Sequence, residues 1–340
     1  MSRDDVIKKL QERKHAGLVL FSSGSTGEPK IVLHDWNKLV AKAMRKPNPA
    51  YRNWTVIGML GMDHIGGVNT LLFCLANQCR LVFPESRTPN DVMKCIEHNK
   101  VQILPTTPSF LRMTLMRGAH RDFDTSSLRL ITYGTEPMDD DLLALVSEAF
   151  PAAILKQTYG LTEVGILSTK SKNRGSLMMK VGGDGYQTRV VDGMLEIKAE
   201  TSMVGYLNAP DPFTEDGWFK TMDRVVQDGD YLMILGRESD FINVGGDKVN
   251  PLDVEKAICT IPGILDCAAY GVPNEIMGQV VGVTIQTLEL NNVGTLKRMI
   301  KQFLKTTLPK YAMPVQVKVT REPLTNDRMK KSRRDSLQKD

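Results

Sequence analysis

The chain has 340 residues, of which 41% are hydrophobic and 24% charged, and a formal net charge of +5, as expected of a globular protein large enough for two domains. No apolar run is long enough for a membrane span, the charged start is unlike a secretion signal, and the basic segment 328–334 lacks the aromatic residues of a nucleic-acid-binding tail. We therefore expect a cytoplasmic protein with no membrane and no nucleic-acid partner.

The first predicted elements flank a loop rich in glycine and serine. Hydrophobic spacing predicts a helix over residues 4–14, and the apolar run 17–21 predicts a strand. The loop 22–30 follows this strand directly. A second helix is predicted over 35–44, because a proline soon afterwards ends it.

Between residues 54 and 160, short strands alternate with helices. One helix opens at Thr88, a capping residue followed by proline, and another spans 139–150. The predicted strands are 55–59, 80–83, 102–104, 128–132 and 154–156. Such alternation is typical of an α/β fold with a layered, largely parallel sheet.

The composition changes at about residue 180. Pairs of glycine and aspartate then separate short β-rich runs, which predicts a small antiparallel β-subdomain over about 180–238. Helices predicted over 252–258 and 295–304 indicate a further α+β domain. We predict a large domain at 1–238 and a small, mobile C-terminal lid domain at 239–340.

The loop 22–30 has the composition of an anion-binding loop. Its glycines let successive backbone N–H groups turn toward one ligand, hydroxyl side chains stand beside them, and Lys30 adds a positive charge. A polyphosphate fits this chemistry, although the Walker A spacing is absent. An ordinary serine- and glycine-rich turn is the alternative interpretation. The residues that we assign to this phosphate-binding loop are Ser22, Ser23, Gly24, Ser25, Thr26, Gly27 and Lys30.

The sequence SSGSTGEPK of this loop resembles the phosphate-loop signature of the adenylate-forming superfamily. That superfamily comprises acyl- and aryl-CoA synthetases, adenylation domains of peptide synthetases, and luciferases. Further motifs similar to the family's follow in the expected order at 133–137, 158–163, 205–208, 217–223, 236–242 and 245–251. The resemblance implies an acid–thiol ligase that forms an acyl-adenylate from ATP and a carboxylic acid, and then passes the acyl group to coenzyme A.

Two alternatives to this function stay open, and the sequence departs from the family in two further respects. An acyl carrier protein, through its phosphopantetheine arm, is an alternative acceptor, and a non-catalytic nucleotide-binding relative is an alternative function. Met222 replaces the glycine of the family's TGD motif. Family members carry a further subdomain before the phosphate-binding loop, whereas only about twenty residues precede it here. We expect either a short synthetase or a homodimer or partner chain that covers the corresponding surface.

The resemblance implies a role for each nucleotide-binding residue. The phosphate-binding loop holds the β- and γ-phosphates of ATP, Glu163 binds the Mg²⁺ ion that bridges them, and Thr162 contacts the α-phosphate. Tyr159 stacks on adenine, and Asp223 and Arg237 bind the ribose hydroxyls. A surface ion pair is the alternative for these last two residues. The loop expected to contact adenine comprises Gly134, Thr135, Glu136 and Pro137.

The resemblance also places residues around the acid. His64 matches the histidine at the edge of the acid pocket in CoA synthetases, and a packed histidine at a helix start is the alternative interpretation. Ile65 stands where peptide-synthetase domains carry an aspartate that pairs with an amino group, so an aryl or alkyl acid is expected. Gly134, Gly160 and Gly165 are expected to line the pocket, where missing side chains leave room.

The second domain is expected to carry the thiol loop, the hinge and the active lysine. Gly245 and Gly246 match the loop that admits the pantetheine thiol, and Ser239 stands at the hinge about which the small domain rotates. The family's lysine motif, PxTxxGKxxR, is degraded here. Counting from its start favours Lys330 or the residue before it, and counting back from its end favours Lys331. Both lysines stay candidates for the contact with the α-phosphate.

Overall fold

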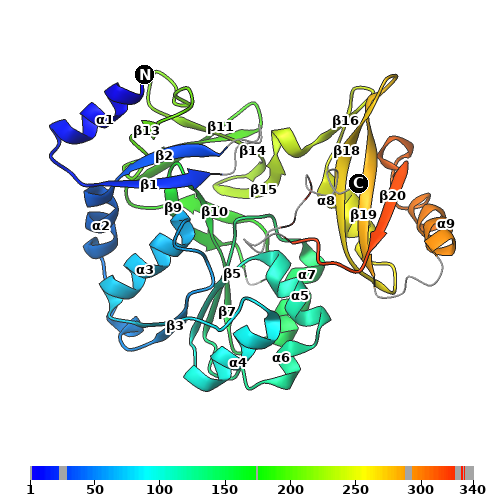
Figure 1. The fold of residues 1–340 in the computed structure, drawn as a ribbon, viewed down its shortest axis with the longest axis horizontal. Helices are drawn as coiled ribbons and strands as arrows, with labels where there is room; N and C mark the ends of the chain where they lie inside the picture. Colours follow the sequence, from blue (N-terminus) through cyan, green and yellow to red (C-terminus); the bar gives the residue numbers. More distant parts are fainter. Residues whose placement is uncertain are drawn as a thin grey trace. The chain divides into compact units, whose positions relative to one another are not determined.

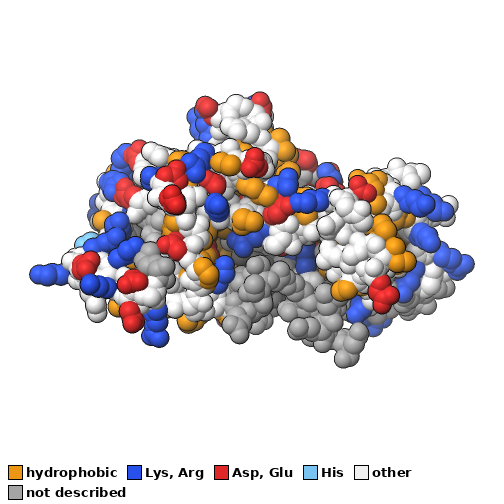
Figure 2. All heavy atoms as spheres, turned by 90° about the horizontal axis from the view of Figure 1, so that it is seen from above, with side chains coloured by type: hydrophobic (Ala, Val, Ile, Leu, Met, Phe, Trp, Pro, Cys, Tyr) orange, Lys and Arg blue, Asp and Glu red, His pale blue; other side chains and the backbone are white. Residues whose placement is uncertain are grey.

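The computed structural model describes residues 2–22, 29–173, 175–287, 293–325, 331 and 333. The chain divides into two compact units, Met1–Ile234 and Leu235–Asp340. Acidic, basic and apolar side chains are interspersed over the face shown in Figure 2. Among the described helices, none is both long and apolar enough to cross a membrane. The domain boundary at Ser239, the mobility of the small domain and the cytoplasmic location stay predictions.

A five-stranded parallel sheet forms the centre of the first unit, with the strand order β4-β3-β5-β6-β7 (Figure 1). Its strands are short, and β5 is buried along its whole length, as in sheets covered on both faces. The predicted α/β class with a parallel sheet is therefore confirmed. The strands are β3 (Thr55–Ile57), β4 (Arg80–Val82), β5 (Ile103–Thr106), β6 (Leu130–Tyr133) and β7 (Ile154–Gln157).

Helices connect these strands, and polar caps fix where three of them begin. The side chains of Thr88, Thr107 and Asp139 each accept a hydrogen bond from a backbone N–H in the first turn. Two of these helices also have proline in the first turn. The helices are α3 (Ile65–Asn77), α4 (Pro89–Asn99), α5 (Pro108–Met116), α6 (Ala119–Asp122) and α7 (Asp140–Ala149), and a short 3-10 helix spans Pro49–Tyr51.

A three-stranded antiparallel sheet carries the phosphate-binding loop. Its order is β1-β2-β13, and β1 forms one edge. Leu33 on one face packs against Val6 and Leu10 of the first helix, while Leu20 belongs to a separate apolar cluster with residues of α2 and α3. The elements are α1 (Arg3–Glu12), β1 (Gly17–Ser22), β2 (Lys30–Asp35), α2 (Trp36–Arg45) and β13 (Gly205–Tyr206).

A seven-stranded antiparallel sheet follows, in the order β11-β12-β14-β15-β10-β9-β8. It begins at Tyr159, earlier than the predicted 180, because β8 and β9 form a tight hairpin that lacks the glycine–aspartate pairs of the later turns. Its core includes Met179, Leu195 and Ile197. The strands are β8 (Tyr159–Leu161), β9 (Gly165–Ser171), β10 (Met179–Gly182), β11 (Tyr186–Val191), β12 (Met194–Ala199), β14 (Phe219–Asp228) and β15 (Tyr231–Arg237).

The second unit is an α+β unit built on a mostly antiparallel sheet. Its order is β17-β16-β19-β18, and β20 pairs parallel with β19. Val281, Val283 and Ile285 are fully buried in its core. The elements are β16 (Ile242–Val244), β17 (Asp247–Val249), α8 (Pro251–Cys259), β18 (Ile264–Asn274), β19 (Gly278–Thr287), α9 (Val293–Leu304) and β20 (Gln316–Thr320), with 3-10 helices at Glu238–Asp240 and Lys310–Ala312.

Met222 adopts a backbone conformation that favours glycine. Its φ is +62°, in the left-handed region, and its side chain is 49% exposed. The pairing of β12 with β14 shifts register around this position, as at a β-bulge. Met222 therefore keeps the backbone that the glycine of the TGD motif would provide, at a conformational cost of about 1–2 kcal/mol.

Candidate active site

The phosphate-binding loop lies in the sequence between the paired strands β1 and β2. Strands β1 and β2 pair with Ser22 opposite Lys30. Asn208 holds the exit of the loop: its Oδ1 accepts the N–H of Ile31 at 2.7 Å, and its Nδ2 donates to the carbonyl of Pro29 at 2.9 Å. This role of Asn208 was not apparent from its motif. Of the predicted loop residues, Ser23, Gly24, Ser25, Thr26 and Gly27 lie outside the described residues.

Tyr206 links the predicted phosphate lysine to the predicted metal ligand. The Nζ atom of Lys30 lies 4.9 Å from the centroid of the Tyr206 ring, a cation–π distance. The Tyr206 hydroxyl donates to Oε1 of Glu163 at 2.7 Å. Both Glu163 and Tyr206 are buried. Sequence reasoning identified the motif that contains Tyr206, but not this link, because a tyrosine 43 residues from Glu163 carries no local signal of its contact.

Glu163 has the chemistry of a ligand for Mg²⁺ that arrives with a nucleotide. The described residues hold no cluster of three or more histidine, cysteine, aspartate or glutamate side chains able to bind a metal. Mg²⁺ in nucleotide sites usually takes one or two carboxylates and fills its other positions with phosphate oxygens and water. A single buried carboxylate, oriented by Tyr206, fits that pattern.

Tyr159, predicted to stack on adenine, and Asp223, predicted to bind the ribose, lie together. The hydroxyl of Tyr159, on β8, donates to Oδ2 of Asp223, on β14, and both side chains are buried. Thr221 fixes the backbone of Asp223: its Oγ1 accepts the Asp223 N–H at 3.0 Å and donates to the carbonyl of Leu195 at 2.7 Å. The β-bulge at Met222 thus lies between two residues with defined hydrogen bonds.

The predicted adenine loop follows β6 and is bonded to the end of β7. Thr158 donates to the carbonyl of Tyr133 from both its N–H, at 2.7 Å, and its Oγ1, at 3.0 Å. A Cβ on Gly134 would lie 2.4 Å from that Oγ1, so only glycine fits. Glu136 instead accepts the N–H of Ser109, at the start of α5, at 2.7 Å. The loop is completed by Thr135, with φ +71°, and Pro137. Ligands of α/β proteins commonly bind at this carboxyl edge of the parallel sheet.

Two of the glycines predicted for the acid pocket lie in the β8–β9 hairpin, and Gly134 follows β6. The hairpin packs against α3 through Ile166 and the cluster that includes Ile65. His64 precedes α3, is partly exposed, and its Nε2 lies 3.2 Å from Oδ2 of Asp63. A Cβ on Gly160 would lie 2.5 Å from the Ile166 side chain. Gly165 has φ +86°. Packing and backbone conformation thus explain both glycines, whether or not a ligand contacts them.

The predicted ribose arginine, hinge serine and thiol-loop glycines belong to the second unit. Gly245 and Gly246 form the turn between β16 and β17, with φ of +60° and +101°, and both are exposed. Ser239 is exposed within the 3-10 helix Glu238–Asp240. Arg237 ends β15. Their predicted contacts with nucleotide and thiol involve the other unit and stay predictions.

Lys331 is held in a buried cluster of charges in the second unit. Its Nζ lies 2.8 Å from Asp266 and 3.3 Å from Glu255, and donates to the carbonyl of Cys267 at 2.7 Å. Arg333 makes two bonds to Glu255, at 2.8 and 2.9 Å. Burial alone would lower the pKa of Lys331, but Asp266 and Glu255 raise it above its usual value. The other candidate, Lys330, lies outside the described residues.

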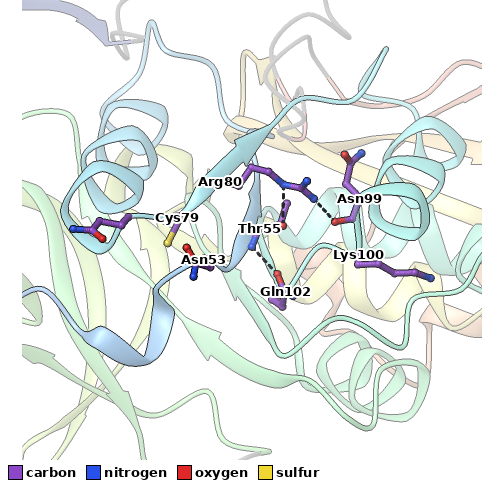
Figure 3. A pocket seen from close by; sticks show the side chains of 8 residues that line it. Asn53, Thr55, Cys79, Arg80, Asn99, Lys100 and Gln102 are labelled. Atoms are coloured by element: carbon purple, nitrogen blue, oxygen red, sulfur yellow. Dashed lines mark hydrogen bonds between the residues drawn. The ribbon is translucent and has the colours of Figure 1, made fainter.

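A polar depression of about 540 Å³ lies at the opposite edge of the parallel sheet (Figure 3). It is lined by residues that precede or begin β3, β4 and β5, such as Thr55 and Arg80. Arg80 donates to Oγ1 of Thr55 and to the carbonyl of Asn99, and Gln102 accepts the Thr55 N–H. These polar groups are therefore bonded to each other. The depression is distinct from the candidate site, because it lies at the amino ends of the strands.

Comparison with known proteins places the chain in a family. The family of AMP-binding enzymes matches residues 4–206, and the C-terminal domain of AMP-binding enzymes matches residues 253–329. The chain therefore belongs to the AMP-binding enzyme family, and the predicted membership of the adenylate-forming superfamily is confirmed.

Individual relatives are named as CoA ligases for different acids. The chain is 25% identical to the long-chain-fatty-acid–CoA ligase FadD13 of Mycobacterium tuberculosis over 88% of its length, and 28% identical to 4-coumarate–CoA ligase 1 of Arabidopsis thaliana over 76%. The crystal structure of the anthranilate CoA ligase AuaEII with anthranoyl-AMP matches with a TM-score of 0.77 and 22% identity over 94% of this chain. The chain spans 62%, 52% and 66% of these three proteins, respectively.

Proposed function

We propose that the protein activates an aryl or alkyl carboxylic acid with ATP and transfers the acyl group to coenzyme A. A carboxylate oxygen attacks the α-phosphorus, the acyl-adenylate forms and pyrophosphate leaves. The thiol, after losing its proton, then attacks the acyl carbon, and AMP leaves as the thioester forms. The observation that carries the proposal is the contact of Tyr206 with both Lys30 and Glu163, which joins the phosphate-binding hairpin to the β8–β9 turn.

Electrostatics is the main demand of the first step, because two anions must approach each other. Lys30 supplies positive charge at the exit of the phosphate-binding loop, and Thr162 precedes the carboxylate of Glu163. Mg²⁺ bound with ATP neutralises phosphate charge and would be held by Glu163. Asp223 would accept hydrogen bonds from the ribose, with Tyr159 beside adenine, since these side chains are already bonded to each other.

The identity of the acid is proposed only as a class. Relatives named for a fatty acid and for coumarate share the fold, so family membership is compatible with either an alkyl or an aryl acid. Ile65 favours an acid without an amino group, because its side chain lies in an apolar cluster and offers no charge. His64 stands at the N-terminal end of the same helix.

ATP–pyrophosphate exchange with a panel of aryl, short-chain and long-chain acids tests this proposal. Exchange that requires both Mg²⁺ and one class of acid is expected, and no exchange with any acid would favour a non-catalytic nucleotide-binding relative. Incubating the active acid with coenzyme A and, separately, with a phosphopantetheine-loaded carrier protein then identifies the acceptor. Gly246→Val, in the exposed turn predicted to admit the thiol, should slow thioester formation and leave the exchange unchanged.

Lys330 is the better candidate for the active lysine. The three N–H donors of the Lys331 ammonium have acceptors in Asp266, Glu255 and Cys267. Moving Lys331 out of this cluster would leave buried carboxylates without its positive charge. Lys330→Ala is therefore expected to lose exchange and keep its thermal stability. Lys331→Ala should instead destabilise the second unit by roughly 3–5 kcal/mol. Full exchange activity in Lys330→Ala would contradict this assignment.

We also propose that another polypeptide surface, from a second copy or a different chain, covers part of the first unit. Val19 and Phe21 are 44% and 48% exposed on β1, an edge strand whose outer side is available for pairing. Size-exclusion chromatography with light scattering tests the idea, and a stable monomer with full activity would contradict it.

A further inference from the structure

Three consecutive carbonyl groups hold the turn between β8 and β9, which is called here the 162–164 turn. One accepts a hydrogen bond from β2, and the other two accept hydrogen bonds from the segment that precedes β13. The carbonyl of Thr162 contacts Nε2 of His34 at 2.5 Å. The carbonyl of Glu163 accepts the N–H of Met203 at 2.7 Å, and that of Val164 accepts Oγ1 of Thr201 at 3.0 Å. Glu163 therefore projects from a turn whose backbone is fixed on every residue.

His34 makes the only one of these three bonds that comes from the phosphate-binding hairpin. It lies on β2, the strand that begins at Lys30. Its side chain is completely buried. Met203 and Thr201 both precede β13, so of these three hydrogen bonds the one from His34 alone ties the 162–164 turn to β2.

The chemistry of the contact fixes the protonation of the ring. A carbonyl oxygen only accepts, so Nε2 of His34 carries a proton and donates it to Thr162. Nδ1 is buried beside the main chain of Thr201. Burial lowers the pKa of His34, although the Thr162 main chain and the charge of Glu163 oppose this effect. The neutral ring with the proton on Nε2 is therefore the form present at neutral pH.

We infer that His34 is a positioning residue that sets the Glu163 carboxylate at the correct distance from the phosphate-binding loop for a shared Mg²⁺–ATP ligand. This inference rests on the proposed function, because it takes Glu163 as the ligand of the metal. His34 touches neither nucleotide nor metal in this account. It acts through the carbonyl of Thr162, and its effect is expected on Mg²⁺-dependent binding rather than on contacts with adenine or ribose.

Two variants that both replace the ring by an amide test whether the hydrogen bond from Nε2 of His34 matters. In His34→Gln the side-chain amide reaches the place of Nε2 and can donate to Thr162. In His34→Asn the amide is one methylene shorter and reaches only the place of Nδ1. Thr114→Val is a matched control: its buried Oγ1 donates to the carbonyl of Phe110 at 2.9 Å, in α5, away from the 162–164 turn. Thermal melting shows whether each variant folds.

Calorimetric binding of ATP with and without Mg²⁺ is the test. His34→Asn is expected to weaken Mg²⁺–ATP binding about tenfold, the scale of one buried hydrogen bond left without its donor. His34→Gln should stay within about threefold of the wild type, Thr114→Val should bind normally, and metal-free ATP should bind equally to all. Equal Mg²⁺–ATP binding by wild type and His34→Asn would overturn the role of His34 and leave the proposed function intact. Failure of the wild type to bind ATP at all would overturn both.

Discussion

Met222 offers a test of the backbone beside the predicted ribose-binding aspartate. Its left-handed backbone, with φ of +62°, is one that residues other than glycine adopt only at a cost. Replacing Met222 by glycine and by alanine removes the same half-exposed side chain. The comparison between these two variants therefore isolates the backbone conformation, because the lost apolar burial is nearly the same in both.

The expected magnitude follows from two opposed terms. Alanine in the left-handed region costs about 1–2 kcal/mol relative to glycine. Glycine loses roughly 0.5–1 kcal/mol more conformational entropy on folding than alanine does. Met222→Gly should therefore be more stable than Met222→Ala by about 0.5–1 kcal/mol. For a unit of this size, that difference corresponds to a melting-temperature increase of about 1–4 °C.

Val226 supplies the control. It lies on the same strand, β14, is 44% exposed and has no positive φ. There the order should reverse, with Val226→Gly less stable than Val226→Ala by roughly 0.5–1 kcal/mol. Urea unfolding followed by tryptophan fluorescence measures all four variants. Met222→Ala equal to or more stable than Met222→Gly would refute the argument that Met222 occupies a glycine position.

Other predictions concern the contacts around the site. Tyr206→Phe keeps the ring beneath Lys30 but loses the bond to Glu163, so the KM for Mg²⁺–ATP should rise about tenfold in the exchange assay, and an unchanged KM would contradict the role of that bond. Asn208→Ala loses both bonds to the loop exit and should raise the same KM more than Asn208→Asp, which keeps the acceptor for Ile31. Equal effects of the two variants would contradict the role of Asn208 at the loop exit. Lys42 lies 3.1 Å from the centroid of the Tyr186 ring, and burial lowers its pKa to about 8. Because the charged form is penalised only in the folded state, the wild type should gain stability relative to Lys42→Met as the pH rises from about 8 to 10.5, and urea unfolding that shows no such gain would refute the shift.

Local signals in the sequence predicted much of the fold. The cap at Thr88 predicted the helix start that the structure has, because its hydrogen bond to the first turn joins residues that are close in the sequence. The same locality explains the error at the start of the antiparallel sheet, which lies at Tyr159 and not near 180. The β8–β9 hairpin has no glycine–aspartate pair to mark its turn, and its pairing depends on packing with later strands.

The candidate site was predicted less completely, for a related reason. Motif order identified Glu163, Tyr159 and Asp223, whose side chains the structure places in defined hydrogen bonds. The supporting contacts of His34 and Asn208 join segments that are 128 and about 178 residues apart, and no local pattern encodes a contact at that separation. The cluster around Lys331 is a further contact of this kind, because Asp266 and Glu255 are distant from it in the sequence.

Transfer of labelled oxygen tests the central claim most directly. The acid that supports exchange is prepared with ¹⁸O in its carboxylate and converted to the thioester with ATP and coenzyme A, and the products are analysed by mass spectrometry. Attack of the carboxylate on the α-phosphorus predicts one ¹⁸O in AMP for each thioester formed, with no label in pyrophosphate. Label in inorganic phosphate with release of ADP, or unlabelled AMP, would contradict the proposal that this chain forms an acyl-adenylate.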